Sequence, residues 1–434
     1  MNDIRANLEI DFKFSNFASI ADRSDSDVEM RKKQDMKERM KIIVAMDSFK
    51  GCLDSREAGD ALARGIRSAN TGRDKPDVEV VEMGDGGEGT AAVLSAAKGG
   101  KYIECPTVNP RFSSMKSGFF EWNEDGENVC AVDVAAAGGL SLLKPEEIDA
   151  KLTSSYGTGL LIRAALERRP KRIIVCLGGS ATIDCGIGAL GALGAKILDE
   201  TGVLQPRELT GGNLGRIRKI DFSEMKKRVG ETEIVIAADV NVGLLGDESG
   251  NNAGAVEIFG PQKGIFLDET ESFRRGVENI CAVLEHATGR DIRRIRGGGA
   301  AGGIGAALFA TVGAKIINGA EFVIETTGLR EKIRGAAGVI TGEGKSDRQT
   351  ACGKLPDAVR RTASECGVGT ALISGRIEDA DCLKHRGFAE MIGINDGLDE
   401  HVNVMNPEVA AYRLMRAGYC FCKNQYRKQE KYTP

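Results

Sequence analysis

Histidine is scarce in this sequence, and CxxC cysteine pairs are absent. The 434 residues include 3 His, and His286, His385 and His401 are too far apart to form a metal-ligand pattern. This excludes a histidine-based zinc site and a Ser-His-Asp triad. The 11 Cys are scattered without a CxxC pair, which is typical of reduced thiols, so we expect a cytoplasmic protein. A bound metal would therefore be held by carboxylates.

Long apolar runs and basic blocks are also missing. No apolar run reaches the ~18 residues of a membrane span, and we expect no signal peptide. The formal net charge is −4, and without a basic block in its body the chain has no electrostatic footprint for nucleic acid. We therefore expect small-molecule partners rather than a membrane or nucleic acid. A homodimer is one assembly that the sequence leaves open.

Glycine, by contrast, is abundant, with 56 residues, well above the usual share of about 7%. The glycines gather in short clusters, GDGGEG, GGSAT, GGGAAGG and TGEG, and not in a repeat. Collagen-like and linker interpretations are therefore excluded. Glycine is placed where the backbone must turn or approach another segment closely.

The clearest of these clusters lies within residues 171–198. Residues 173–177 predict a buried strand, and apolar residues return at helical spacing over 187–198. Between them is a loop of small residues, Gly178, Gly179, Ser180, Ala181 and Thr182. Such a loop can point backbone N–H groups and a helix N-terminus at an anion such as phosphate. Alternatively, the glycines let the helix pack tightly and Asp184 caps it; the loop alone leaves both interpretations open.

Predicted strands and helices alternate along most of the chain. Strands are expected at 41–45, 78–83, 233–238, 338–341, 368–374 and 390–394, and helices at 55–69, 90–99, 157–168, 269–288 and 297–316. This alternation indicates an α/β fold with parallel sheets, whose ligands bind at the carboxyl ends of the strands. Residues 102–108, 116–122 and 128–134 instead predict hairpins, the start of a second module.

Standard nucleotide motifs fail on inspection. Gly344, Lys345 and Ser346 match the end of a Walker A loop, but Val339 stands where its first glycine is required. Two GxGxxG matches, at 186–191 and 297–302, do not follow a strand directly, so they indicate close helix packing. A nucleotide would have to be bound by a less common design.

What remains is a set of loops that combine small residues with carboxylates after apolar strands. These loops carry Asp47, Lys50, Asp85, Glu88, Asp184, Asp239 and Glu343. Phosphoryl transfer needs this mixture, because glycine amides and lysine hold phosphates while carboxylates bind Mg²⁺ or accept a hydroxyl proton. Any single Asp can instead be a turn or cap residue.

Together with these loops, the order of the motifs in the sequence resembles the bacterial-type (type 1) glycerate kinase family. Seven motifs follow the order of that family: KIIVAMDSFKG at 41–51, MGDGGEGT at 83–90, YGTG at 156–159, GGSATIDCG at 178–186, FGPQKG at 259–264, GAAGG at 299–303 and TGEGKSDRQTACGKLP at 341–356. The resemblance implies transfer of the γ-phosphate of ATP to D-glycerate, giving 2-phosphoglycerate. It also implies two α/β domains, a Rossmann-like parallel-sheet domain with a second α/β domain inserted, and an active site in the cleft between them.

We expect a disordered leader at 1–40, the first domain at 41–100 and 290–417, the inserted domain at 101–289, and a frayed tail at 418–434. Asp184 is the predicted general base, and Asp47 and Lys50 are the other catalytic candidates. Substrate and phosphate contacts are expected from Ser48, Gly178, Gly179, Ser180, Ala181, Thr182, Lys263 and Lys345. Mg²⁺ contacts are expected from Asp85, Asp239 and Glu343.

The chain departs from the family pattern at five positions. The family pattern has Pro at the position of Met46, Ser at Cys52 and Asn at Ile183. It has Arg at the position of Lys345 and a small residue at Arg348. Two alternatives to a glycerate kinase therefore stay open: a kinase for another small hydroxy acid, and a catalytically weakened homologue that binds nucleotide or glycerate. A dehydrogenase is disfavoured because the dinucleotide motifs lack their structural context.

Overall fold

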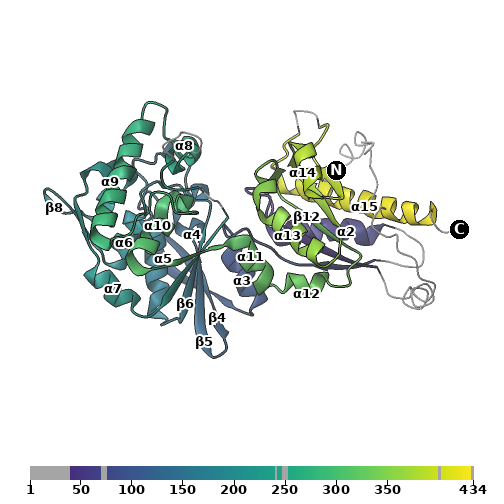
Figure 1. The fold of residues 1–434 in the computed structure, drawn as a ribbon, viewed down its shortest axis with the longest axis horizontal. Helices are drawn as coiled ribbons and strands as arrows, with labels where there is room; N and C mark the ends of the chain where they lie inside the picture. Colours follow the sequence, from purple (N-terminus) through teal and green to yellow (C-terminus); the bar gives the residue numbers. More distant parts are fainter. Residues whose placement is uncertain (1–39, 70–75, 240–241, 247–252, 399–401, 432–434) are drawn as a thin grey trace. The chain divides into compact units, whose positions relative to one another are not determined.

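The computed structural model describes residues 40–69, 76–239, 242–246, 253–398 and 402–431. Their contacts define two compact units, which are considered separately below (Figure 1). Unit 1 combines Met1–Met83 with Thr327–Pro434, and unit 2 is Gly84–Thr326. The predicted leader at 1–40 lies outside the described residues except for Met40.

Unit 1 is built on a parallel sheet of five strands. These are β1 (Lys41–Met46), β2 (Asp77–Val80), β12 (Gly338–Gly342), β14 (Thr370–Ser374) and β16 (Glu390–Gly393), in the order β16-β14-β12-β1-β2. In β1, every residue from Ile42 to Met46 is buried, as expected for a strand covered on both faces. Counted along the chain the order is 2-1-3-4-5, the flavodoxin-like order, whose direction reverses between β1 and β12.

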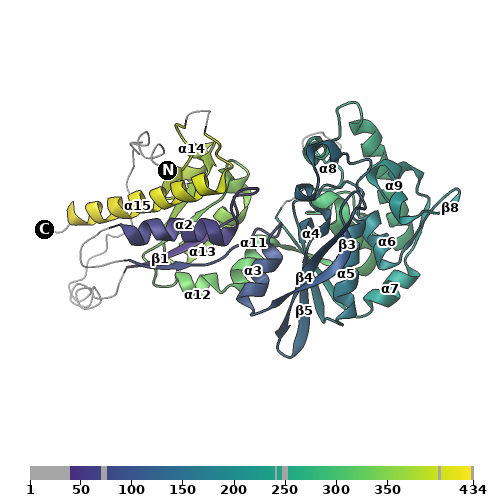
Figure 2. The same cartoon turned by 180° about the vertical axis from the view of Figure 1, so that it is seen from behind.

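The helices of unit 1 are α2 (Ser55–Ser68), α12 (Leu329–Ile333), α13 (Leu355–Glu365), α14 (Ala380–Arg386) and α15 (Pro407–Lys431). α15 lies along α2 (Figure 2). Gly418 permits this close approach, because a Cβ there would lie 2.3 Å from the carbonyl oxygen of Leu62. The tail predicted from 418 is instead the second half of α15, and its Phe421 and Cys422 are buried in the core of unit 1.

Asp54 caps the N-terminus of α2. Its carboxylate accepts from Glu57 N at 2.7 Å, and its own backbone N donates to Glu57 Oε2 at 3.0 Å. The Ser55 hydroxyl donates to Met46 O and accepts from Met83 N, both at 2.8 Å. Ser55 therefore ties the end of β1 to the segment that follows β2.

Unit 2 contains a mixed sheet of six strands. These are β3 (Lys101–Val108), β4 (Ser114–Glu124), β5 (Glu127–Asp133), β6 (Arg172–Leu177), β10 (Glu233–Ala238) and β11 (Lys315–Asn318), in the order β11-β10-β6-β5-β4-β3. The strands from β11 to β5 are parallel, and β4 is antiparallel to both of its neighbours. The hairpins predicted within 102–134 are thus confirmed, but they extend the same sheet as β6.

The helices of unit 2 are α3 (Thr90–Ala97), α4 (Ala135–Gly138), α5 (Tyr156–Glu167), α6 (Ile187–Leu193), α7 (Ser223–Val229), α8 (Ala255–Phe259), α9 (Thr270–Thr288), α10 (Ile304–Val312) and α11 (Gly319–Thr326). α3 packs against β4, β5 and β6, and β11 pairs with β10. For this reason the units divide at 84 and 326, whereas the predicted limits at 100/101 and 289/290 lie within unit 2.

Two predicted helices are shorter than expected. The helix predicted over 187–198 ends at Leu193, because Gly194 has a φ of 108° and turns the chain into β7 (Lys196–Asp199). The helix predicted over 297–316 contains only α10, which ends before Gly313 at a φ of 73°. Before α10 the stretch forms a 3-10 turn at Ala300–Gly303, and after it Lys315 and Ile316 begin β11. In both cases a left-handed glycine ends the helix, as such residues commonly do.

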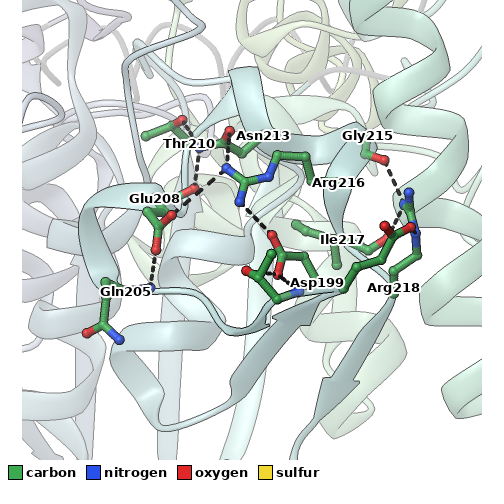
Figure 3. Close-up of polar contacts among 11 residues, drawn as sticks. Asp199, Gln205, Glu208, Thr210, Asn213, Gly215, Arg216, Ile217 and Arg218 are labelled. Carbon is green, nitrogen blue, oxygen red and sulfur yellow. Dashed lines mark hydrogen bonds and ion pairs between the residues drawn. The ribbon is translucent and has the colours of Figure 1, made fainter.

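A small sheet of β7, β8 (Gly202–Val203) and β9 (Lys219–Asp221) is held by a polar cluster (Figure 3). Arg216 Nη2 donates to Asp199 Oδ2 at 2.6 Å, and Arg216 Nη1 lies 3.9 Å from Glu208 Oε1. Hydrogen bonds from Thr201, and then the contact with Arg216, lower the pKa of Asp199 from 3.8 to about 2. The cluster fixes the segment before β9 against the end of β7.

Across the described part of the chain, none of the helices combines the length and the apolar character needed to span a bilayer.

Candidate functional site

The carboxyl ends of four neighbouring strands of unit 1 open into one pocket of about 1070 Å³. Asp47 follows β1, Glu343 follows β12, Gly375 follows β14 and Ile394 follows β16, and all four line the pocket. The pocket therefore spans the β1/β12 position, where the strand order reverses. Doubly wound sheets bind their ligands at this position.

Four basic side chains, Lys50, Lys345, Lys354 and Arg376, line the same pocket. Lys345 and Arg376 are held side by side, because β13 (Lys345–Ser346) pairs with β15 (Arg376–Ile377). Both also contact Glu378: Lys345 Nζ lies 3.0 Å from Glu378 Oε2, and Arg376 Nε lies 3.6 Å from Glu378 Oε1. The pocket thus offers a cluster of cations suited to an anionic ligand.

Glu343 organises the loop after β12. Its Oε1 accepts hydrogen bonds from Thr350 Oγ1 at 2.6 Å and from Ser346 Oγ at 3.1 Å. Ser346 Oγ in turn lies 2.7 Å from Ser374 Oγ at the end of β14. Burial raises the pKa of Glu343, while the hydrogen bond from Thr350 and the positive charge of Lys354 act to lower it.

The structure brings five predicted site residues together in this pocket: Asp47, Ser48, Lys50, Glu343 and Lys345. Sequence reasoning missed four further lining residues, Lys354, Arg376, Asn395 and Asp396. The sequence did contain a signal for these four residues, because Lys354 belongs to the motif at 341–356 and the other three follow predicted strands.

In unit 2, the predicted glycine loops pack directly against one another. A Cβ on Gly178 would lie 2.6 Å from Gly87 Cα, and one on Gly86 would lie 2.8 Å from Gly319 Cα. A Cβ on Gly302 would lie 2.0 Å from Thr182 O. The loops at 84–89, 178–182 and 299–303 therefore need glycine for close backbone approach.

The loop at 178–182 is not the open anion cradle that its sequence suggested. Ala181 N donates to Gly138 O at 2.8 Å, so this amide is already used within the protein. Ser180, Ala181 and Thr182 are buried, whereas Gly179 is exposed. The structure supports the alternative interpretation, in which small residues allow tight packing.

Asp184 is fully buried two residues before Gly186, the N-cap of α6. Its Oδ2 accepts from Ser155 N at 2.8 Å, Ser155 Oγ at 2.7 Å and Gly188 N at 3.2 Å, and its Oδ1 accepts from Gly186 N at 3.1 Å. Burial raises the pKa of Asp184, and these hydrogen bonds act to lower it. The carboxylate is thus engaged in joining the N-termini of α5 and α6, which supports a positioning role rather than that of a general base.

Lys263 supports the same loop from within unit 2. Its ammonium, on a residue that is 3% exposed, donates to Ser180 Oγ and to Thr182 O, both at 2.9 Å. Burial lowers the pKa of Lys263 to about 7, against the opposing effect of the Asp184 charge. Lys263 therefore does not contact a ligand directly; it positions Ser180 and Thr182.

Two further acidic residues of unit 2, Asp133 and Asp239, lie at strand ends, and Asp85 lies in the loop at 84–89. Asp85 Oδ1 accepts from Gly87 N at 2.7 Å, and Gly86 lies against Ala238 at the end of β10, next to Asp239. Asp133, the last residue of β5, was not predicted; it accepts from Gly89 N at 3.2 Å and Ala91 N at 3.0 Å at the start of α3. Burial raises the pKa of Asp133 to about 7.

Among the described residues, no group of three or more His, Cys, Asp or Glu side chains is placed to hold a metal. A Mg²⁺ ion commonly takes one or two carboxylates and completes its shell with phosphate oxygens and water. Asp85 and Asp239 supply two carboxylates within unit 2, and the loop of Asp85 lies against the end of β10, next to Asp239. Glu343 belongs to unit 1, and one of its oxygens already accepts two hydrogen bonds.

Ile183, which replaces the Asn of the family pattern, is fully buried in the hydrophobic core of unit 2. Its side chain packs away from solvent, so it places no apolar group on an exposed binding surface.

A flavodoxin-like parallel sheet with a pocket of lysines and carboxylates at its switch point is typical of α/β proteins that bind phosphorylated small molecules. Comparison with known proteins gives the particular family. The chain belongs to the glycerate kinase family, whose sequence model matches residues 42–422.

Individual relatives agree with this assignment. The chain is 37% identical over 352 residues to the glycerate kinase of Haemophilus influenzae, covering 80% of this chain and 89% of that protein. It is 36% identical over 350 residues to the glycerate 2-kinase of Escherichia coli K12, covering 80% and 88%. The crystal structure of a protein assigned as glycerate kinase 2 from Salmonella typhimurium LT2 matches with a TM-score of 0.71 and 30% identity, covering 91% of this chain and all of that one.

Proposed function

We propose that this protein is a glycerate kinase that transfers the γ-phosphate of ATP to D-glycerate and yields 2-phosphoglycerate. Family membership supports the reaction class, and the relative named glycerate 2-kinase supports the position of transfer. The observation that carries the proposal is the unit 1 pocket, where Lys50, Lys345 and Lys354 meet the carboxylates of Asp47 and Glu343 at the switch point.

The residues of the pocket suit charge neutralisation, which is the main task in phosphoryl transfer. Lysine ammonium groups bind phosphate oxygens and compensate the charge that spreads over them in the transition state. Lys50 is the proposed central cation, since it follows β1 directly at the switch point. Asp85 and Asp239 are the proposed carboxylate ligands of a Mg²⁺ ion within unit 2.

The ten cysteines whose side chains are described are free thiols, which supports a cytoplasmic location for this proposed activity. A homodimer is a further proposal for the assembly of this protein.

A coupled assay of ADP release with D-glycerate and Mg²⁺, followed by phosphorus NMR of the product, tests the function. We expect glycerate-dependent ADP release, and Lys50→Met should lower kcat/KM by at least ~100-fold, as the loss of a preorganised charge does. Lys41→Met is the matched control, because Lys41 lies at the opposite end of β1 and pairs with Glu79. Absence of turnover in the unmodified protein, with ATP still raising the melting temperature, would favour the catalytically weakened homologue.

A further inference from the structure

The unit 1 pocket has two chemically different parts. The cations and carboxylates described above gather at the strand ends. An apolar wall of the same pocket is formed by Ile377, Leu398, Val404 and Met405. This wall is not sealed in the core, because Met405 is 52% exposed. A ligand with an apolar face would cover this apolar wall and remove its surface from water, which is favourable.

The two parts are adjacent. The methyl carbon of Met405 lies 3.4 Å from the position that a Cβ on Gly51 would take, and Gly51 directly follows Lys50. A single elongated ligand can therefore contact both the apolar wall and the cations without a gap between them.

The apolar part also offers a polar contact. Asn395 lines the pocket, and its Oδ1 is buried without a hydrogen-bond partner among the described residues. A buried amide oxygen left in this state costs free energy, and it is satisfied by a donor such as the exocyclic amino group of adenine. Asn395 is held in place, because its backbone N donates to Gly375 O at 2.9 Å.

These observations distinguish the two co-substrates. Glycerate is a small acid without an apolar face, and it would leave most of a pocket of about 1070 Å³ unfilled. A purine nucleoside triphosphate has a flat base for the apolar wall and a polyanionic end for the cations. Resting on the proposed function, we infer that the unit 1 pocket is the nucleotide site, with the adenine against Leu398, Val404 and Met405 and the phosphates toward Lys50, Lys345 and Lys354.

The test uses the full chain and the fluorescent nucleotide mant-ATP in the absence of glycerate. Met405→Glu, at a half-exposed position that tolerates a polar group, should raise the Kd of mant-ATP at least about tenfold. The matched control is Leu267→Glu, which makes the same change of charge at a residue of unit 2 that is 93% exposed; its Kd should stay within about twofold of the unmodified protein. In turnover assays, Met405→Glu should raise the KM for ATP and leave that for glycerate unchanged.

A raised KM for glycerate with unchanged mant-ATP binding would overturn the inference, as would a lack of mant-ATP binding by the unmodified protein. Photolabelling of the unmodified protein with 8-azido-ATP gives an independent answer: label is expected in peptides of 376–410, and label confined to 84–326 would refute the inference. Because binding is measured without turnover, a protein that binds mant-ATP through Met405 but does not phosphorylate glycerate would support the nucleotide site and reject the proposed function.

Discussion

The buried Lys263 makes the stability of unit 2 depend on pH in a specific direction. Its pKa is about 7 in the folded protein and 10.5 as the ordinary value, which the unfolded chain retains. Between these values the unfolded chain binds a proton that the folded one does not. The free energy of unfolding should therefore rise with pH by about 1.4 kcal/mol per unit. This stability is fully present above pH 10.5 and is lost as the pH falls toward 7.

The perturbation that isolates this effect is Lys263→Met, which keeps an unbranched side chain one heavy atom shorter and removes its charge. At pH 7, the loss of the hydrogen bonds to Ser180 Oγ and Thr182 O should cost about 1 to 3 kcal/mol. Between pH 7 and 9.5, the unmodified protein should gain about 3 kcal/mol relative to the variant. Other titrating groups contribute equally to both proteins and cancel in the difference.

The assay is urea denaturation followed by the fluorescence of Trp122. This is the one Trp of the sequence, and it is buried in β4 of unit 2, so it reports on the unit that contains Lys263. Lys219→Met, at an exposed position of β9, is the matched control and should show no such difference. A constant difference between the Lys263 variant and the unmodified protein from pH 7 to 9.5 would refute the reasoning.

Three other predictions follow from the geometry. Asp184→Asn places an amide against four donors, so unit 2 should lose about 1 to 3 kcal/mol of stability by Trp122 fluorescence; a loss of turnover at unchanged stability would instead restore the general-base hypothesis. Gly418→Ala forces α15 away from Leu62 O and should destabilise unit 1 by about 1 to 3 kcal/mol in calorimetry, whereas Gly215→Ala, which has open space around it, should not. Asp199→Asn should lower the free energy of unfolding at neutral pH. In acid titrations, the difference in this free energy from the unmodified protein should vanish as the pH falls from 3.8 to about 2. A difference that persists below pH 2 would contradict the role of the Asp199 charge.

Local chemistry explains why much of the fold could be predicted from sequence. A run such as 41–46 is apolar and β-branched, so it predicts a buried strand in any tertiary setting. Placement of Asp47 and Glu343 after such strands was enough to predict that they share one edge of a parallel sheet, because parallel strands end at the same edge. The motif order in 41–356 likewise indicates the family from the sequence alone.

The tertiary structure decided what the polar and glycine residues do. The loop at 178–182 looks like an anion cradle because its composition is permissive, yet its packing against 84–89 and 299–303 depends on segments far away in sequence. The same holds for Asp184, whose partner Ser155 lies 29 positions away, and for Lys263, whose burial comes from the surrounding core. Sequence specified which residues can form strands, turns and charged loops, because those preferences are local. Which carboxylates face a ligand and which serve as caps depends on long-range packing, and only the folded chain determines it.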